Sequence, residues 1–256
     1  MEKYKKTVQE KQERKYEEKY EELALWKKTQ KTTMFLVQEI GTKRVWMKKS
    51  YPLEKAKIYG KLQKQHHKNI LMIKEVIIRE EECIVIEEFV NGTTLTEHLS
   101  LHKDGKISLN QALSWCSAIC DGLIWLHKVG IIHRDINQNN VMITFDGIVK
   151  LCDFDIARVY QQGKSVDTEI LGTQGSVAPE QYGYGQSSNK SDIYAVGVLL
   201  NKMLTGKEID EEIYSGNIKV QKIIKIATAL DENERFTNAL SLKHALDDAL
   251  KKREKF

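Results

Sequence analysis

The chain has 256 residues, with 40 Lys and Arg against 36 Asp and Glu, and its formal net charge is +4. Because the two signs are interleaved, the charge does not predict a nucleic-acid-binding surface, and no apolar run is long enough to predict a membrane span. The four cysteines form no C-x-x-C pair and the first residues contain no apolar core. We therefore expect buried free thiols, no signal peptide and a cytoplasmic protein.

The first part of the chain, residues 1–21, is almost wholly charged and has no Gly or Pro, which predicts a helical extension. We expect a solvated helix or a disordered tail there, and docking to a partner protein is the alternative. Residues 22–90 follow as a mainly β segment. Strands are expected at residues 24–26, 35–40, 44–49, 71–78 and 83–88, with one main helix at 53–65.

The remaining part, residues 91–256, is mainly helical. Ser108 or Asn110 can cap a long helix through Leu126, in which apolar residues recur at a spacing near 3.6. Further amphipathic helices are predicted at residues 190–204, 218–230 and 239–250. The expected fold class is α+β, with a small β-rich part that contains one main helix and a larger helical part.

The most informative stretch is 133–155, because it places three polar side chains at separations that suit one task. Asp135 and Asn140 are five residues apart. Two short apolar strands follow within 141–152, and the Asp-Gly pair between them predicts a β-hairpin. Because the hairpin brings the chain back on itself, Asp153 should lie beside Asn140. A carboxylate and an amide oxygen suit Mg²⁺, and Asp135 can orient a hydroxyl and accept its proton.

Five motifs in this chain resemble those of the eukaryotic-type protein kinase family, and the resemblance extends from about residue 22 to residue 250. They are H-R-D-x-x-x-x-N at His133 to Asn140, D-F-G at Asp153-Phe154-Asp155, A-P-E at Ala178-Pro179-Glu180, a buried helix Asp at Asp192, and a paired Arg at Arg235. Each motif alone is weak, but the five occur in the expected order and spacing. The run from Ala178 to Gly183 is most similar to the short bacterial serine/threonine kinases.

The resemblance implies an enzyme that uses Mg-ATP to phosphorylate Ser and Thr hydroxyls of protein substrates, and that phosphorylates itself. Asn140 and Asp153 would hold Mg²⁺, and Asp135 would orient the substrate hydroxyl. Thr173 would hydrogen-bond Asp135, which favours Ser/Thr over Tyr specificity. A pseudokinase that acts as a scaffold is the alternative, and these intact residues oppose it. The motif at Glu180 belongs to the protein-substrate lobe, which disfavours a small-molecule kinase.

The family's phosphate-binding lysine lies on the third strand, where Lys48 and Lys49 are both candidates. Strand side chains alternate between faces, so the lysine shares its face with the residue two positions earlier. Lys48 would share a face with Trp46, which would fill an adenine pocket. Lys49 would share one with Met47, which is flexible and apolar, so we choose Lys49.

The resemblance also implies the adenine contacts. Met34 and Met47 would form the roof of the adenine site and Met142 its floor, although methionines are also common core fillers. The hinge would supply backbone groups, namely the carbonyl of Glu88 and both polar groups of Val90.

Several positions depart from the family pattern. Lys27, Thr29 and Thr32 stand where the glycines of the phosphate-binding loop would be. They would form either a charged cover for phosphate or a hairpin that contacts nothing. Asp155 replaces the glycine of D-F-G and would bond to local backbone amides or help to bind a second metal ion. Asn137 stands where serine/threonine kinases carry a Lys that touches the γ-phosphate.

The glutamate of the main small-lobe helix is missing as well. Ile58 aligns with its position, and Glu54 lies about one turn earlier. Glu87 occupies the gatekeeper position, where a hydrophobic residue is usual in the family, and a buried carboxylate needs a partner. We therefore hypothesise that Glu87 holds Lys49. The alternative is that Glu87 turns to solvent or bonds elsewhere.

The segment 156–177 corresponds to the family's activation loop. Thr168 is nearest the usual phosphorylation site and Ser165 is second, and a phosphate there could pair with Arg134. The adjacent Glu169 is an alternative source of the negative charge.

Overall fold

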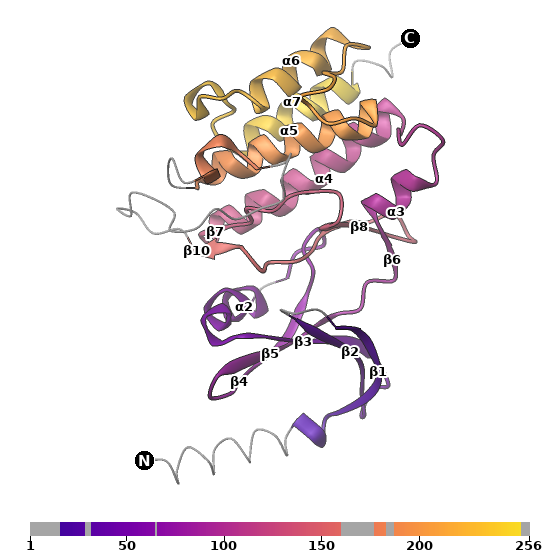
Figure 1. The fold of residues 1–256 in the computed structure, drawn as a ribbon, viewed down its shortest axis with the longest axis vertical. Coiled ribbons are helices and arrows are strands. Elements are labelled where there is room, and N and C mark those ends of the chain that lie inside the picture. Colours follow the sequence, from indigo (N-terminus) through magenta and orange to yellow (C-terminus); the bar gives the residue numbers. More distant parts are fainter. Residues whose placement is uncertain (1–15, 29–31, 65, 160–176, 183–186, 252–256) are drawn as a thin grey trace. The chain divides into compact units, whose positions relative to one another are not determined.

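The structure, a computed structural model, describes residues 16–28, 32–64, 66–159, 177–182 and 187–251 (Figure 1). By its internal contacts the chain divides into two compact units. The small unit comprises Met1–His66 and Leu71–Val90, and the large unit comprises His67–Ile70 and Asn91–Phe256.

The small unit is built on an antiparallel five-stranded sheet with the order β1-β2-β3-β5-β4. The strands are β1 (Tyr20–Lys28), β2 (Thr33–Glu39), β3 (Val45–Pro52), β4 (Ile73–Ile78) and β5 (Glu82–Glu88). Between β3 and β4 lie a 3₁₀ turn, Leu53–Lys55, and helix α2, Ala56–Gln63. Helix α2 packs against β4, and Tyr59 stacks on Tyr51 at the end of β3 with ring centroids 4.7 Å apart.

Two tyrosines at the start of the described chain pack on one face of this sheet. Tyr16 and Tyr20 are buried in a cluster with Trp46 of β3 and with residues of β2 and β5. We expected residues 1–21 to be a solvated helix or a disordered tail, and for these two tyrosines that prediction is wrong. The composition is charged, but two aromatic rings four residues apart pack on the apolar sheet face while Glu17 and Glu18 stay exposed.

The large unit contains four main helices among the described residues, together with short strands. Its elements are β6 (Gly92–Thr94), α3 (Leu95–Ser100), α4 (Leu109–Lys128), β7 (Ile131–Ile132), β8 (Val141–Thr144), β9 (Val149–Leu151), β10 (Arg158–Val159), α5 (Asn189–Thr205), α6 (Ile218–Ala227) and α7 (Ala239–Lys251). Helix α4 packs against α5, α7 and β9 and forms the centre of the unit (Figure 1). Strands β6, β8 and β9 form one small sheet, and β7 pairs with β10.

Capping residues fix where two of these helices begin. The Ser108 side chain accepts a hydrogen bond from the backbone N–H of Gln111, so it is Ser108, and not Asn110, that caps α4. A capping box formed by Thr94 and Glu97 starts the short helix α3. Helix α6 ends at Ala227, three residues earlier than the pattern predicted.

The architecture agrees with the predicted α+β class, because the small unit is β-rich with one main helix and the large unit is mainly helical. All four cysteines are buried free thiols, as expected. Within the described part of the chain, no helix has the length and apolar character needed to cross a membrane.

Candidate active site

The predicted hairpin is present in the large unit. Strands β8 and β9 pair antiparallel, and the turn between them places Gly147 at a positive φ of 85°. The backbone N–H of Cys152 donates to the carbonyl of Asn140 at 2.8 Å. Because Asp153 follows Cys152 directly, it lies beside Asn140, as the sequence predicted.

Two amide side chains hold the Asp135 carboxylate. Asn137 donates from Nδ2 to Asp135 Oδ1 at 2.9 Å, and Asn140 donates from Nδ2 to Asp135 Oδ2 at 2.7 Å. Asn140 also donates to the Asp135 backbone carbonyl at 2.9 Å. The carboxylate is therefore oriented at both oxygens before any substrate is considered.

The same hydrogen bonds fit Asn140 for a metal ion. Because its Nδ2 donates to Asp135, its Oδ1 is the atom left to ligate a cation, and Asp153 would supply the second ligand. Among the described residues there is no group of three or more His, Cys, Asp or Glu that could hold a metal. A two-ligand arrangement nonetheless fits Mg²⁺, which commonly binds through one or two carboxylates, substrate phosphates and several waters.

The backbone around Asp153 is shaped to present its carboxylate. Asp153 has a φ of 62°, and its Oδ1 accepts a hydrogen bond from the backbone N–H of Asp155 at 3.1 Å. Asp and Asn tolerate this left-handed conformation better than most residues, because their short side chains bond locally. We expected the side chain of Asp155 to bond to local backbone amides or to help bind a second metal ion. Both alternatives stay predictions.

A buried carboxylate anchors the backbone that precedes Asp135. Asp192 on α5 accepts from the backbone N–H groups of His133 at 3.0 Å and Arg134 at 2.8 Å, and lies 2.7 Å from His127 Nε2. Burial alone would raise the pKa of Asp192, but the hydrogen bond and charge of His127 and the loop donors outweigh it and lower that pKa. Arg134 itself has a φ of 70°, a strained conformation for a residue with a long side chain. These bonds hold the backbone directly before Asp135.

Further contacts join this loop to its surroundings. His133 Nε2 lies 3.2 Å from the carbonyl of Cys152, and its ring packs against Phe154 with centroids 5.1 Å apart. Gln181, which the sequence did not single out, donates from Nε2 to the Arg134 carbonyl at 3.0 Å. The loop and the segment at Phe154 are therefore positioned together.

Glu180 and Arg235 form the ion pair that the motifs indicated. Arg235 Nη1 and Nη2 donate to the two oxygens of Glu180 at 2.7 and 2.9 Å. Arg235 also donates to backbone carbonyls of Ala229, Lys190 and Leu230. Burial would raise the pKa of Glu180, but the Arg235 hydrogen bonds, with smaller contributions, hold it below its ordinary value.

In the small unit, Lys49 and Glu87 form a buried ion pair. Lys49 Nζ lies 2.7 Å from Glu87 Oε1, and the two residues are 9% and 4% exposed. Met34 is the cross-strand partner of Lys49, and Met47 is the partner of Glu87. Since directly paired residues point to the same side of a sheet, these four side chains share one face.

Lys48 points to the opposite face, where its partners are different. It forms an ion pair with Glu22, and its ammonium group lies 4.9 Å from the ring centroid of Tyr16 and 5.2 Å from that of Phe35. Trp46 belongs to the same cluster. The two lysines thus lie on opposite faces of the sheet, as the alternation predicted, and it is Lys49 that shares a face with Met34 and Met47.

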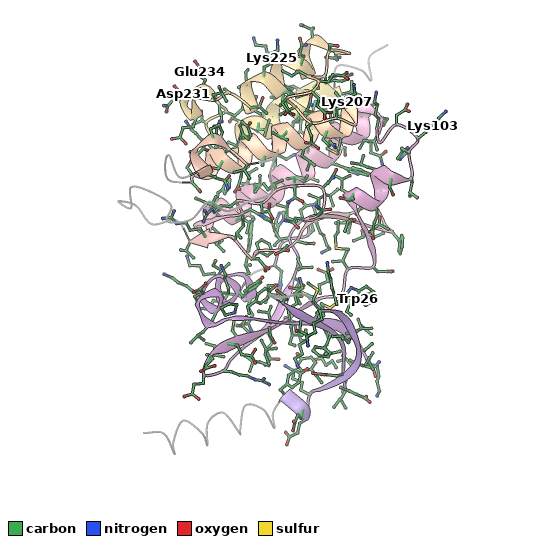
Figure 2. All side chains as sticks on the ribbon, in the orientation of Figure 1. Trp26, Lys103, Lys207, Lys225, Asp231 and Glu234 are labelled. Carbon is green, nitrogen blue, oxygen red and sulfur yellow. The ribbon has the colours of Figure 1, made fainter. Side chains whose placement is uncertain are left out.

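The remaining predicted residues occupy varied environments. Glu88 Oε2 accepts from the backbone N–H of Met72 at 3.2 Å, and Val90 is buried at the end of the small unit. Met142 lies half-buried on β8 of the large unit. Trp26, labelled in Figure 2, was not among the predicted site residues, and its ring meets that of Phe89 edge-on with centroids 5.7 Å apart. Thr29, Thr173 and the predicted phosphorylation sites Ser165 and Thr168 lie outside the described residues.

Asn137 is the site residue whose role sequence reasoning missed. The pattern indicated only that a Lys was absent, whereas the structure shows a hydrogen-bond donor to Asp135. An Asn two residues after an Asp can reach back to it within one turn, which is the signal that the sequence carried.

Comparison with known proteins shows which class of protein this chain belongs to. Residues 26–255 match the family model of the protein kinase domain, so the chain belongs to the protein kinase family. The predicted family and the predicted α+β fold class, with a small β-rich part and a larger helical part, are thereby confirmed.

Particular relatives include plant, animal and bacterial kinases. The chain is 33% identical over 152 residues to calmodulin-binding receptor-like cytoplasmic kinase 3 of Arabidopsis thaliana, a match that covers 57% of this chain and 30% of that protein. It is 31% identical over 202 residues to the serine/threonine-protein kinase Nek1 of Mus musculus, covering 78% and 16%. It is 32% identical over 142 residues to the probable serine/threonine-protein kinase PknB of Lactococcus lactis, covering 55% and 22%. The matched region is thus less than a third of each relative.

Proposed function

We propose that the chain is an active protein serine/threonine kinase that transfers the γ-phosphoryl group of Mg-ATP to Ser or Thr hydroxyls of protein substrates. The observation that carries this proposal is the environment of Asp135, whose two oxygens accept hydrogen bonds from Asn137 and Asn140. A carboxylate held in this way has a fixed direction in which it can accept a proton. Membership of the kinase family and the serine/threonine kinases among the relatives support the same reaction.

In the proposed reaction, the protein positions groups and neutralises charge rather than forming covalent intermediates. Asp135 orients the substrate hydroxyl and takes its proton while the hydroxyl oxygen bonds to the γ-phosphorus and the bond to ADP breaks. Asn140 and Asp153 would hold Mg²⁺, which when bound neutralises phosphate charge. Lys49 would contact the α- and β-phosphates.

The adenine contacts of the proposal come from the same resemblance. Met34 and Met47, which share the face of Lys49, would cover one side of the adenine ring, and Met142 the other. The backbone of Glu88 and Val90 would hydrogen-bond to its edge. These contacts need apolar side chains and main-chain groups, which the residues present can supply.

A scaffold without phosphoryl transfer is the competing function. It is favoured by the missing glycines at Lys27 and Thr32 and by the missing glutamate of α2. The decisive experiment measures transfer from radiolabelled ATP to a generic protein substrate by the wild type and by Asp135→Asn. We expect the variant to lose about 100-fold or more, the usual contribution of a positioned general base. Equal transfer by both proteins, including no transfer by either, would refute the proposal and favour the scaffold.

We further propose autophosphorylation, at Thr168 or Ser165. Mass spectrometry of residues 156–177 after incubation with Mg-ATP should find phosphate, and its absence would contradict this part.

Docking of a partner protein to the charged extension also remains a proposal, restricted to residues that do not pack on the sheet as Tyr16 and Tyr20 do. The buried free thiols support a reducing compartment such as the cytoplasm.

A further inference from the structure

The small unit offers a way to hold the catalytic lysine that does not involve its helix. We infer that Glu87 on β5 is the positioning residue for Lys49, and that helix α2 takes no part in holding this lysine. The inference rests on the proposed kinase function and concerns how the same site is regulated.

Helix α2 cannot supply the carboxylate. Its sequence, Ala56–Gln63, contains no Asp or Glu, and no carboxylate occurs between Glu54 and Glu75. Glu54 is exposed in the 3₁₀ turn before the helix. Ile58, which occupies the position where the family's glutamate is expected, is buried as part of the helix's apolar face.

Glu87 supplies a carboxylate from within the sheet. Strands β3 and β5 are paired antiparallel with Met47 opposite Glu87, so Lys49 is the diagonal neighbour of Glu87 on the same face. The side chains meet at 2.7 Å and both are almost fully buried. A buried carboxylate and a buried ammonium each lose most of their hydration, and therefore each depends on the other.

The location of the pair has a consequence for regulation. The separation of Lys49 and Glu87 is set by the backbone hydrogen bonds of two adjacent strands, which form as one unit with the fold. A pair formed between a sheet and a helix can be broken when the helix moves, and this is a common switch. Because the pair lies between β3 and β5, moving α2 does not open it, and the lysine stays held whatever the position of the helix.

The chain provides a matched control for this pair. Glu39 at the end of β2 is also buried, at 8% exposure, and lies 3.3 Å from Lys74 Nζ. It belongs to the same sheet, but it pairs with Tyr20, whose side chain packs on the opposite face. Glu39→Gln therefore removes a similar buried charge from the same unit without touching the face of Lys49.

The first experiment compares kcat and the KM for ATP of Glu87→Gln and Glu39→Gln with those of the wild type, together with their melting temperatures. We expect Glu87→Gln to lower kcat about 100-fold, the effect of misplacing a reacting group by about 1 Å. Glu39→Gln should lower the melting temperature at least as much but change kcat by less than about twofold, a purely structural effect that does not reach the chemistry. Near-normal kcat in Glu87→Gln, or an equal loss in both variants, would overturn the inference.

The second experiment asks whether Glu87 acts through Lys49. When Lys49→Met is already present, adding Glu87→Gln should cause no further loss of kcat/KM, because the partner is gone. A further loss as large as that seen in the wild-type background would mean that Glu87 acts on something else. Ile58→Ala, measured well below its melting temperature, should loosen α2 yet keep kcat within about twofold, and a loss comparable to that of Glu87→Gln would implicate the helix.

Failure of the inference can be told apart from failure of the proposed function. If the wild type transfers no more phosphate than Asp135→Asn does, the proposed function is wrong, and the pair is then tested by calorimetric titration with Mg-ADP. Glu87→Gln should weaken Mg-ADP binding as much as Lys49→Met does, whereas Glu39→Gln should leave it unchanged. Unweakened binding by Glu87→Gln would overturn the inference on this readout as well.

Discussion

Replacement of Glu180 by Ala should unfold the large unit at a much lower temperature, because it leaves the buried guanidinium of Arg235 without its counter-charge. The Arg235 side chain is 0% exposed, and both oxygens of Glu180 accept from it within 2.9 Å. Breaking one side of a buried ion pair costs about 3–5 kcal/mol. At about 2–4 °C per kcal/mol for a chain of this size, the melting temperature should fall by about 6–20 °C.

Acid should remove this difference between wild type and variant. The folded-state pKa of Glu180 is lowered from 4.5, so the charged form stabilises the fold at neutral pH. That stabilisation is lost as the pH falls below the unfolded value and through the depressed folded value. The free energy of unfolding of the wild type should therefore approach that of Glu180→Ala in acid.

The assay is urea unfolding followed by far-ultraviolet circular dichroism, which reports mainly on the helices. The matched set is Glu180→Ala, Arg235→Met and the double variant. If the pair carries the energy, the double variant should be less destabilised than the sum of the singles by about 1 kcal/mol or more. Additive losses, or a deficit that persists unchanged in acid, would refute the reasoning.

Two glycine substitutions should change the free energy of unfolding in opposite directions in the same urea assay. Gly60→Ala should raise the free energy of unfolding by about 0.5–1 kcal/mol, because a Cβ there meets no atom within 4 Å in the middle of α2, and a decrease would contradict this. Gly92→Ala should lower it by about 1–3 kcal/mol, because its Cβ would overlap the backbone carbonyl of Ile143. Asn137→Ala should reduce kcat about 10- to 100-fold with little change in KM, because Asp135 loses the hydrogen bond that Asn137 donates to its Oδ1. Steady-state kinetics test this, and an unchanged kcat would show that the hydrogen bond from Asn137 is not needed to orient the carboxylate.

The parts of the site that the sequence predicted are those that local chemistry controls. The Asp-Gly turn sets the β8–β9 hairpin, which alone is enough to bring Asp153 beside Asn140. Strand alternation is equally local, so the sequence predicted correctly that Lys48 and Lys49 point to opposite faces of their strand. Ser108 could be named as a cap, together with an alternative, because capping depends on a few neighbouring residues.

Other features depend on residues far apart in the chain and could not be predicted in this way. The tyrosines of the charged extension pack on the sheet because Trp46 and its neighbours present an apolar face there. Gln181 reaches the Arg134 carbonyl across 47 positions of sequence. The hydrogen bonds of Asp192 to the loop before Asp135 likewise require α5 and the loop to be packed already.

The sequence by itself determined the family and the order of the motifs, and it predicted Asn140, Asp153 and Asp135 as the residues for a metal ion and a proton. Those properties follow from residue types at short separations, where turns and strand alternation leave few arrangements. The sequence left open whether Glu87 holds Lys49 or turns elsewhere, and only the tertiary structure decided between the two. That choice depends on the register between β3 and β5, whose backbone hydrogen bonds place Glu87 2.7 Å from the lysine while α2 offers no carboxylate at all.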